Sequence, residues 1–574
     1  MSQKKRTWER VAADPRVAAE LSSRCSISLG MAKVLANRGI VDERSARLFL
    51  APDVGSMHDP FALPDMQAAA GRLLDAVRQG EKIRVYGDYD EDGISSVSLV
   101  VSVLRACGAD VDYYIPNRLI EGYGLSVEAI QKAAADGVAL LVTADCGIGA
   151  FDEAEAAQSC GVDLIITDHH ESGASVPRCA AVVNPKRPDS DYPFKELAGV
   201  GVAFKLCQAL WRFAGRPGGA ADPHGYLDLV ALGTIADVVP LLDENRMIAK
   251  LGLEIMSRST NPGIQSLLDV AGLAGRDIKA GNVSFTLGPR VNAAGRLGDP
   301  SLGARLFLTD SRQEASELAA MLDEENRRRQ EIELAILRQV WEPVSKMNTQ
   351  LTRAIVLGSE DWHSGVIGIV ASKIAEMTYR PTVLVAFEGD VGRGSARSIP
   401  GFNLFSALTE CSDLLLKYGG HAQAAGLSIR PEDLGEFRER MNRIGHERLS
   451  EEDLIPKLYF DEELAESEIS DALARELSAL EPHGLGNPSP VFVTRNMLVL
   501  ERRCVGEGGR HLKLKLGRGD AVVSAIGFRM TQRYSDIARN SAEVDVAYSL
   551  DVNEWNGRTY AEMNLKDIRR SSVG

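Results

Sequence analysis

Short apolar runs alternate with longer amphipathic stretches along residues 66–185. The runs are rich in β-branched residues and have the length of strands, whereas the stretches repeat their apolar residues at helical spacing. Strands that alternate with helices in this way form βαβ units, so the pattern predicts a mostly parallel sheet. The predicted strands span 83–88, 110–116, 138–147, 162–170 and 179–185, and the predicted helices span 66–79, 94–108, 127–137 and 151–161.

The pattern changes after this sheet. Residues 225–345 are helical in pattern and end in a charged stretch without Gly or Pro before Pro343, which predicts one extended helix joining two bodies. A second α/β pattern follows, and five short alternating strands after it predict a small β-barrel. The predicted fold is therefore α/β, in five segments: a helical preface (1–64), a parallel-sheet domain (65–310), the connecting helix (311–345), a second α/β domain (346–450) and a C-terminal barrel (455–574).

The net charge of the chain bears on whether it binds nucleic acid. The 574 residues include 80 acidic and 65 basic side chains, which gives a formal charge of −15 in an otherwise ordinary globular composition. That composition excludes a disordered acidic tail, a collagen and a small disulfide-rich scaffold. The net negative charge, taken alone, opposes a nucleic-acid partner because it repels phosphates.

The cysteines and the apolar segments indicate in which cellular compartment the protein is found. The eight cysteines are scattered without a C-x-x-C pair, which argues against a zinc ribbon and is typical of a reducing compartment. No apolar core follows the cations near the N-terminus, and the best apolar run, Val97–Leu104, is far shorter than the roughly 20 residues that span a bilayer. We expect a soluble, cytoplasmic protein that contacts no membrane.

Acidic or imidazole side chains directly follow three of the predicted strands, namely Asp88 and Asp90, then Asp145, then Asp168 with His169 and His170. The carboxyl ends of parallel strands share one edge of a sheet, where ligands bind, so these side chains should converge. Carboxylates forced together repel one another, and a divalent cation removes that repulsion. Oxygen-rich ligands with imidazole and without thiolate favour Mn²⁺ or Mg²⁺, and two such ions about 3.5–4 Å apart would support phosphoester cleavage.

Several of these residues also have a purely structural explanation. An Asp after a strand commonly caps a helix or forms a turn, and Asp92 is open to that explanation at the start of the helix 94–108. Asp237 lies in a nearly apolar helical stretch, where a buried charge is costly unless it is paired or bound to metal, which favours a ligand. The segment GVGVAFK (199–205) lacks the spacing of a P-loop and predicts close helix packing.

Eight motifs resemble those of the DHH phosphoesterase superfamily, in the same order. Four resemble its first motifs: GDYDEDG (87–93), TADCG (143–147), DHH (168–170) and TIADVVPL (234–241). GPRVNAAGRLGD (288–299) resembles a motif of one branch, the RecJ exonucleases. Three further motifs resemble those of the second domain associated with this superfamily: WHSGVIGIVASKI (362–374), GSARS (394–398) and GGHAQAAG (419–426). The resemblance implies a catalytic two-metal centre with the ligands Asp88, Asp90, Asp145, His169 and Asp237, and with His170 orienting a ligand or contacting phosphate.

The resemblance also implies a substrate site. A pocket for a 5′-phosphate would be formed by Arg118, Arg296, Ser395 and Arg397, with Asn292 beside it. The substrate cleft would be lined by His363, Gly420 and His421. The barrel would be OB-like, and seven basic against two acidic residues between Pro490 and Arg518, a balance of +5, predict a groove for a single strand.

The activity implied by the resemblance is that of a 5′→3′ exonuclease specific for single-stranded DNA, which releases 5′-mononucleotides in DNA recombination and repair. Its cofactors would be two Mn²⁺ or Mg²⁺ ions, and it would be a monomer whose partners are a 5′-phosphorylated single strand, a single-strand-binding protein and a RecQ-type helicase. One alternative is a phosphodiesterase acting on short oligonucleotides or cyclic dinucleotides, although such relatives lack the added barrel. Another is a non-catalytic DNA-binding protein, which the complete ligand set opposes.

Overall fold

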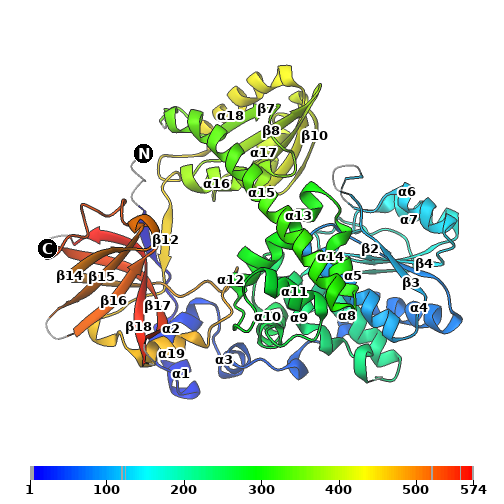
Figure 1. Ribbon diagram of the computed structural model, residues 1–574, viewed down its shortest axis with the longest axis horizontal. Helices are drawn as coiled ribbons and strands as arrows, with labels where there is room; N and C mark the ends of the chain where they lie inside the picture. The colour runs from blue at the N-terminus through cyan, green and yellow to red at the C-terminus, as the bar shows by residue number, and fades with distance from the viewer. Residues whose placement is uncertain are drawn as a thin grey trace. The chain divides into compact units, whose positions relative to one another are not determined.

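The structure is a computed structural model that describes residues 6–117, 121–122, 124–216, 218–348, 350–518, 521–555 and 558–571 (Figure 1). The chain forms two compact units. The smaller unit consists mainly of residues 323–458 together with residues 296–298, and the larger unit consists mainly of residues 9–295, 299–322 and 459–574.

A parallel sheet organises the first half of the larger unit, as predicted. Its strands lie in the order β3-β2-β4-β5-β6, and each neighbouring pair is parallel. The strands are β2 (Ile83–Gly87), β3 (Val111–Tyr114), β4 (Leu140–Ala144), β5 (Asp163–Thr167) and β6 (Ala181–Val183). The helices between and before them are α4 (Met66–Gln79), α5 (Glu91–Ala106), α6 (Val127–Ala135) and α7 (Phe151–Cys160). The predicted α/β class is therefore confirmed.

Alternate residues of each strand serve two different cores. On one face, Val85 and Val142 pack in a cluster with α4, α5 and later helices. On the other face, Tyr86 and Leu141 pack in a cluster with α6 and α7 (Figure 1). Because strand side chains alternate with a period of two, burial on both faces produces the continuous apolar runs seen in the sequence.

The strand order reverses between β2 and β4. From β2 the chain runs outward to β3, and it then returns to β4 on the opposite side of β2. At such a switch point the loops leaving the two strands diverge and open a crevice at the carboxyl end of the sheet. Asp88 follows β2 and Asp145 follows β4, so both carboxylates lie at this crevice.

Helices complete the larger unit's first half, and most pack into the same core as the sheet. They are α8 (Gly199–Phe213), α9 (Leu227–Ala236), α10 (Asp243–Met256), α11 (Pro262–Val270), α12 (Ala280–Asn282), the π-helical turn η5 (Val283–Leu287), α13 (Gly288–Leu297) and α14 (Ser301–Leu308). The next helix, α15 (Arg312–Lys346), runs unbroken for 35 residues and includes Pro343 near its end, as predicted. Its first part packs in the core of the larger unit through Leu322, and its later part packs in the smaller unit through Val340. No helix in the described part of the chain is long and apolar enough to cross a membrane.

The smaller unit has a five-stranded mixed sheet in the order β10-β11-β9-β8-β7, in which only β7 and β8 are parallel. The strands are β7 (Ile355–Ser359), β8 (Thr382–Glu388), β9 (Val391–Arg397), β10 (Leu415–Gly420) and β11 (Ala424–Ile429). The helices are α16 (Ile367–Thr378), α17 (Leu404–Thr409) and α18 (Leu434–Arg448).

The C-terminal strands close into the predicted five-stranded barrel, because β17 pairs with β18 and also back to β14. They are β14 (Phe492–Val505), β15 (His511–Arg518), β16 (Ala521–Gly527), β17 (Glu543–Trp555) and β18 (Arg558–Arg570). The N-terminal helices α1 (Pro15–Cys25), α2 (Leu29–Asn37) and α3 (Glu43–Leu50) share one hydrophobic cluster with this barrel and with α19 (Asp471–Ser478). The predicted preface and the predicted barrel thus have a common core, while the boundaries of the five predicted segments stay predictions.

Candidate functional site

The structure brings the six residues predicted for the metal centre together at the crevice. In three groups of side chains, the ligand-type atoms all lie within 4.8 Å of one another. The groups are Asp88, Asp90 and Asp145; Asp145, His169 and His170; and Asp92, His169 and Asp237. Asp145 and His169 each belong to two groups, so they lie at the middle of the cluster.

His169 is held with one ring nitrogen toward the carboxylates. Its Nδ1 lies 3.1 Å from the carbonyl oxygen of Leu197, so this nitrogen carries the proton and donates. Its Nε2 keeps a lone pair and lies 3.2 Å from Asp145 Oδ1 and 3.7 Å from Asp237 Oδ2. Burial, together with the neighbouring His170, lowers the pKa of His169 to about 4, so the ring is neutral at physiological pH. A neutral imidazole fixed through its other nitrogen is the form that binds metal.

Asp168 orients the second histidine. Its Oδ1 accepts hydrogen bonds from His170 Nδ1 at 2.8 Å and from the backbone N–H of His170 at 3.0 Å, and its Oδ2 accepts from Ile148 N at 2.8 Å. Burial alone would raise the pKa of Asp168, but the bonds from His170 more than offset it and hold the pKa below its ordinary value. Asp168 therefore stays ionised beneath the cluster as the group that supports His170.

Two neighbouring aspartates cap two different helices. Asp90 Oδ1 accepts from the backbone N–H groups of Asp92 and Gly93, each at 3.1 Å, and so caps α5. The sequence pattern allowed Asp92 to cap its own helix, α5, but in the structure it caps another helix. Its two oxygens accept from Gly199 N and Val200 N, both at 2.7 Å, and so tie the start of α8 to α5 beside His169.

Asp145 has few groups to stabilise its charge. Its side chain is buried, and its Oδ1 accepts no hydrogen bond from any described residue. The residue adopts the left-handed backbone region with φ 64°, which is uncommon for a non-glycine residue and is associated with functional sites. A Cβ on Gly199 would lie 2.4 Å from Asp145 Oδ1, so glycine is required where α8 begins. The prediction of close packing at residues 199–205 therefore holds at Gly199. The group that packs against this glycine is the carboxylate of Asp145.

The donor set fits divalent cations that prefer oxygen. Burial, followed by repulsion from Asp92, Asp90, Asp237 and Asp88, raises the pKa of Asp145 well above its ordinary value. Burial and Asp90 raise the pKa of Asp237 to about 7. Ionising these buried carboxylates next to one another costs free energy, and a bound cation removes that cost. A donor set of oxygen with imidazole nitrogen is suited to Mn²⁺ or Mg²⁺. The cluster could therefore hold such ions.

We expect the raised carboxyl pKa values of this cluster to make the metal-free protein less stable as pH rises from about 4 to about 7. Because the pKa values of Asp145, Asp92 and Asp237 are raised, the folded protein retains protons that the unfolded chain has already released. Between the ordinary carboxyl pKa and the raised one, each retained proton makes the free energy of unfolding fall by roughly 1.4 kcal/mol per pH unit, and the fall ends once the pH exceeds the raised value. His169, whose pKa is lowered to about 4, opposes this effect below about pH 6.5, because there the unfolded chain binds a proton that the folded protein does not, but the three carboxyl groups outnumber it.

Thermal unfolding of the chelator-treated protein at three pH values across this window measures the effect. Added Mn²⁺ should flatten or reverse the trend, because the ion replaces the protons. A metal-free protein that melts at a higher temperature as pH rises would contradict the raised pKa values.

Four predicted substrate residues gather in the smaller unit around the segment that begins α16. Arg296 Nη1 donates to the carbonyl oxygen of Gly365 at 3.2 Å, and the backbone N–H of Gly365 donates to His363 Nδ1 at 3.1 Å. Ser395 and Arg397 lie two residues apart on β9, and Arg397 Nη1 donates to Ser395 Oγ at 3.2 Å. A Cβ on Gly368, in the first turn of α16, would lie 2.9 Å from that Oγ. The group presents two guanidinium ions, a hydroxyl and a helix N-terminus together, which is a suitable environment for an anion.

The remaining predicted substrate residues are placed differently. Asn292 Oδ1 accepts from the backbone N–H of Glu91 at 2.8 Å and so fixes the start of α5. Gly420 has φ 135°, and a Cβ there would lie 2.5 Å from the carbonyl oxygen of Ala424 in the β10–β11 hairpin. His421 is exposed at the same hairpin. Arg118 lies outside the described residues.

Acidic residues from outside the basic stretch of the barrel neutralise part of its positive charge. The +5 balance counted residues 490–518 alone, whereas other strands and segments bring acidic partners to these side chains. Arg495 pairs with Glu463 and with Asp545, and Lys513 pairs with Glu562. The sequence window therefore overstates the positive charge of the barrel surface.

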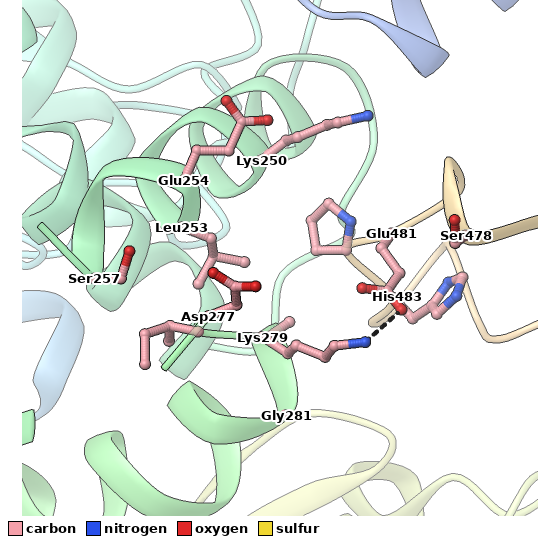
Figure 2. A pocket seen from close by; sticks show the side chains of 13 residues that line it. Lys250, Leu253, Glu254, Ser257, Asp277, Lys279, Gly281, Ser478, Glu481 and His483 are labelled. Carbon is pink, nitrogen blue, oxygen red and sulfur yellow. Dashed lines mark hydrogen bonds and ion pairs between the residues drawn. The ribbon is translucent and has the colours of Figure 1, made fainter. Parts of the chain in front are cut away.

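A cavity of about 410 Å³ lies in another part of the larger unit (Figure 2). It is bounded by α10, by residues 277–281 and by residues 478–483, which begin at the last residue of α19. Lys279 pairs with Glu481 at 2.9 Å on its wall. Its described lining residues include none of the predicted site residues. The chemistry of the cluster therefore identifies the site better than cavity size does.

Three family models match successive parts of the chain. The DHH family N-terminal domain matches residues 82–234, the DHHA1 domain matches residues 348–447, and the RecJ OB domain matches residues 460–567. They correspond to the parallel-sheet half of the larger unit, the smaller unit and the barrel.

Full-length relatives extend this match. The single-stranded-DNA-specific exonuclease RecJ of Bacillus subtilis is 39% identical over 568 residues, which cover 98% of this chain and 71% of the relative. The protein of the same name from Escherichia coli is 38% identical over 557 residues, covering 93% and 95% of the two chains. A crystal structure of RecJ in complex with Mn²⁺ from Thermus thermophilus matches with a TM-score of 0.85 and 35% identity, over 99% of this chain and 80% of that one. The chain belongs to the RecJ family of single-stranded-DNA-specific exonucleases.

Proposed function

We propose that this chain is a metal-dependent 5′→3′ exonuclease that degrades single-stranded DNA to 5′-mononucleotides in DNA recombination and repair. The observation that carries the proposal is the convergence of carboxylates and two imidazoles at the switch point of the sheet, around a buried Asp145 oxygen that accepts no hydrogen bond from the described residues. Membership of a family named for this activity supports the same conclusion.

In this proposal the metal ligands are Asp88, Asp90, Asp145, His169 and Asp237. Two Mn²⁺ or Mg²⁺ ions bound there would supply Lewis acidity for phosphodiester hydrolysis. The protein's own part is to fix the ligands. The carbonyl oxygen of Leu197 orients His169, and Asp168 orients His170, whose ring lies half-exposed beside the cluster and can donate to a phosphate oxygen.

The direction of degradation would come from recognition of a 5′-phosphate. We assign this role to Arg296, Ser395 and Arg397, with Arg118 as a further member. A guanidinium fork binds two phosphate oxygens at once, and a hydroxyl and the positive end of a helix dipole add to the attraction. A terminal phosphate offers more oxygens and more charge to such a pocket than an internal phosphodiester does, so a strand end is favoured.

End-labelled oligonucleotides test the proposal directly. With Mn²⁺, a 5′-phosphorylated single strand should yield mononucleotides from its 5′ end, and the matching blunt duplex should be degraded at least ten-fold more slowly. Equal rates on both, or loss of nucleotides from the 3′ end, would overturn the proposal. A series of lengths separates the alternative, because a phosphodiesterase for short oligonucleotides would cleave dinucleotides faster than long strands. Substrate length is a cleaner variable than deleting the barrel, which would expose the core that it shares with α1–α3.

The proposed partners and setting follow from the substrate. A single-strand-binding protein and a RecQ-type helicase would protect and supply single strands, and the eight free cysteines are compatible with the cytoplasm. We propose that the protein acts there as a monomer, with residues 455–574 holding the single strand. Light scattering during gel filtration tests the oligomeric state.

A further inference from the structure

Three consecutive buried side chains at the start of α10 connect distant parts of the larger unit. They are Glu244, Asn245 and Arg246, and each has at most 1% of its surface exposed. Successive side chains on a helix point about 100° apart, so each of the three reaches a different segment. Only one of them reaches the segments that carry the metal centre.

Asn245 bonds to both segments that flank the centre. Its Nδ2 donates to the carbonyl oxygen of Glu196 at 2.5 Å and to that of Pro240 at 3.1 Å. Its Oδ1 accepts from the backbone N–H of Ala198 at 3.4 Å. One amide therefore clamps residues 196–198 to the segment that follows α9.

Each clamped segment carries a group that fixes a proposed ligand. Within residues 196–199, the carbonyl oxygen of Leu197 orients His169, and Gly199 abuts Asp145. Pro240 lies three residues after Asp237, and the intervening Val238 has φ 64° and is 62% exposed, so its side chain contributes little packing to this turn. The clamp thus sets the spacing between Asp237 and the groups around His169.

We propose that Asn245 is a positioning residue, which holds His169 and Asp237 at the separation that metal binding requires. The inference rests on the proposed function, since it assigns these residues as ligands. Asn245 touches no ligand itself and acts through the backbone on both sides of the centre. Groups of this kind behind a metal site typically affect metal affinity or activity by about 10–100-fold.

The chemistry of the position calls for an amide. Two carbonyl oxygens need donors and one N–H needs an acceptor, and a primary amide supplies all three bonds. Leucine at this position has nearly the same size but would leave these buried backbone groups unpaired. Aspartate would keep the acceptor but would set a carboxylate against two carbonyl oxygens.

The two neighbours of Asn245 serve other parts of the structure. Glu244 accepts from Tyr192 Oη at 2.5 Å and pairs with the buried Lys205. Arg246 donates to the carbonyl oxygens of Phe49 and of residues 479–482, the segment that forms one wall of the cavity in Figure 2. Changes at these sites should affect stability without changing the spacing at the centre, so they provide controls.

Asn245→Leu and Asn245→Asp in the full chain test the inference, with Tyr192→Phe as the matched control. Tyr192→Phe removes one buried hydrogen bond to the same turn of α10 but leaves the clamp intact. Mn²⁺ affinity is measured by titration calorimetry well below the unfolding temperature, and kcat and KM are measured on a 5′-phosphorylated single strand. Both Asn245 variants should bind Mn²⁺ at least ten-fold more weakly, with KM for the strand within two-fold of the parent. Excess Mn²⁺ should restore part of kcat, and Tyr192→Phe should lower the unfolding temperature while keeping the parent's affinity.

The outcomes separate this inference from the proposed function. If the parent protein neither binds Mn²⁺ nor degrades single strands, the proposed function fails. If the parent does both and the Asn245 variants bind Mn²⁺ with parental affinity, the positioning role is overturned. It is also overturned if Tyr192→Phe loses as much affinity as they do, because general loosening of α10 would then explain the result. Asn245→Ser, which is small and polar, replaces either variant that fails to fold.

Discussion

Replacing Asp145 by asparagine should lower kcat by about 10³-fold or more, while the metal-free protein becomes more stable. Asparagine keeps the shape of the side chain and removes its charge. The centre then loses a carboxylate shared by two of the ligand groups, and a loss of about 4 kcal/mol of charge stabilisation corresponds to about 10³ in rate. The folded state meanwhile loses a buried charge that repels Asp92, Asp90 and Asp237, so the unfolding temperature without metal should rise.

Asp228→Asn is the matched control for this variant. Asp228 is also buried with a raised pKa, caused by burial, but it lies at the opposite end of α9 from Asp237. It should keep the parent's kcat and its Mn²⁺ affinity. Single-turnover cleavage of a labelled strand and melting curves with and without Mn²⁺ give both readouts. An Asp145→Asn variant with the parent's turnover would remove Asp145 from the metal centre.

The parts of the site that follow strands could be predicted from the sequence. A parallel strand buried on both faces reads as an apolar run, and the residue after it lies at the binding edge of the sheet. Asp88, Asp145 and His169 could therefore be assigned to one cluster from local pattern alone. The extended helix α15 was equally accessible, because its helical spacing persists over 35 residues without a break.

The supporting groups could not be predicted in the same way, because their partners are distant in the chain. Asp92 caps a helix that begins 107 residues later, and Arg495 pairs with Glu463 from outside the basic window. Asn245 and Leu197 carry no distinguishing sequence pattern, since one works through its amide and the other through a backbone carbonyl. Local periodicity specifies which face a residue occupies, but it does not specify which distant segment lies opposite.

The net charge of the chain illustrates the same limit. The aspartates near the crevice are concentrated in one cluster in the larger unit. Arg296 and Arg397, near the start of α16, lie in the smaller unit. A sum over the whole sequence averages these opposite environments. Local charge, and the hydrogen bonds that hold it in place, decide which group binds a phosphate or a cation.

Gly199→Ala should reduce kcat by about 10²-fold, because misplacing a catalytic group by about 1 Å commonly costs that much. The added Cβ would lie 2.4 Å from Asp145 Oδ1 and 2.7 Å from Asp145 Cβ, so either the carboxylate or the start of α8 must move. Both are enclosed, since Asp145 is buried and the N–H of Gly199 is bonded to Asp92. The same variant should bind Mn²⁺ more weakly.

Alanine is otherwise a favourable residue in a helix, by up to about 1 kcal/mol over glycine, so the fold should persist. Gly71→Ala in α4 is the control, because the nearest atom to its added Cβ is 3.9 Å away on Phe213. That variant should keep full activity and gain slight stability. If Gly199→Ala kept the parent's kcat and Mn²⁺ affinity, Asp145 would have room to move, and the argument that a glycine fixes its position would be wrong. Loss of activity without loss of fold would instead show that the shape of α8 at its first residue is part of the metal centre.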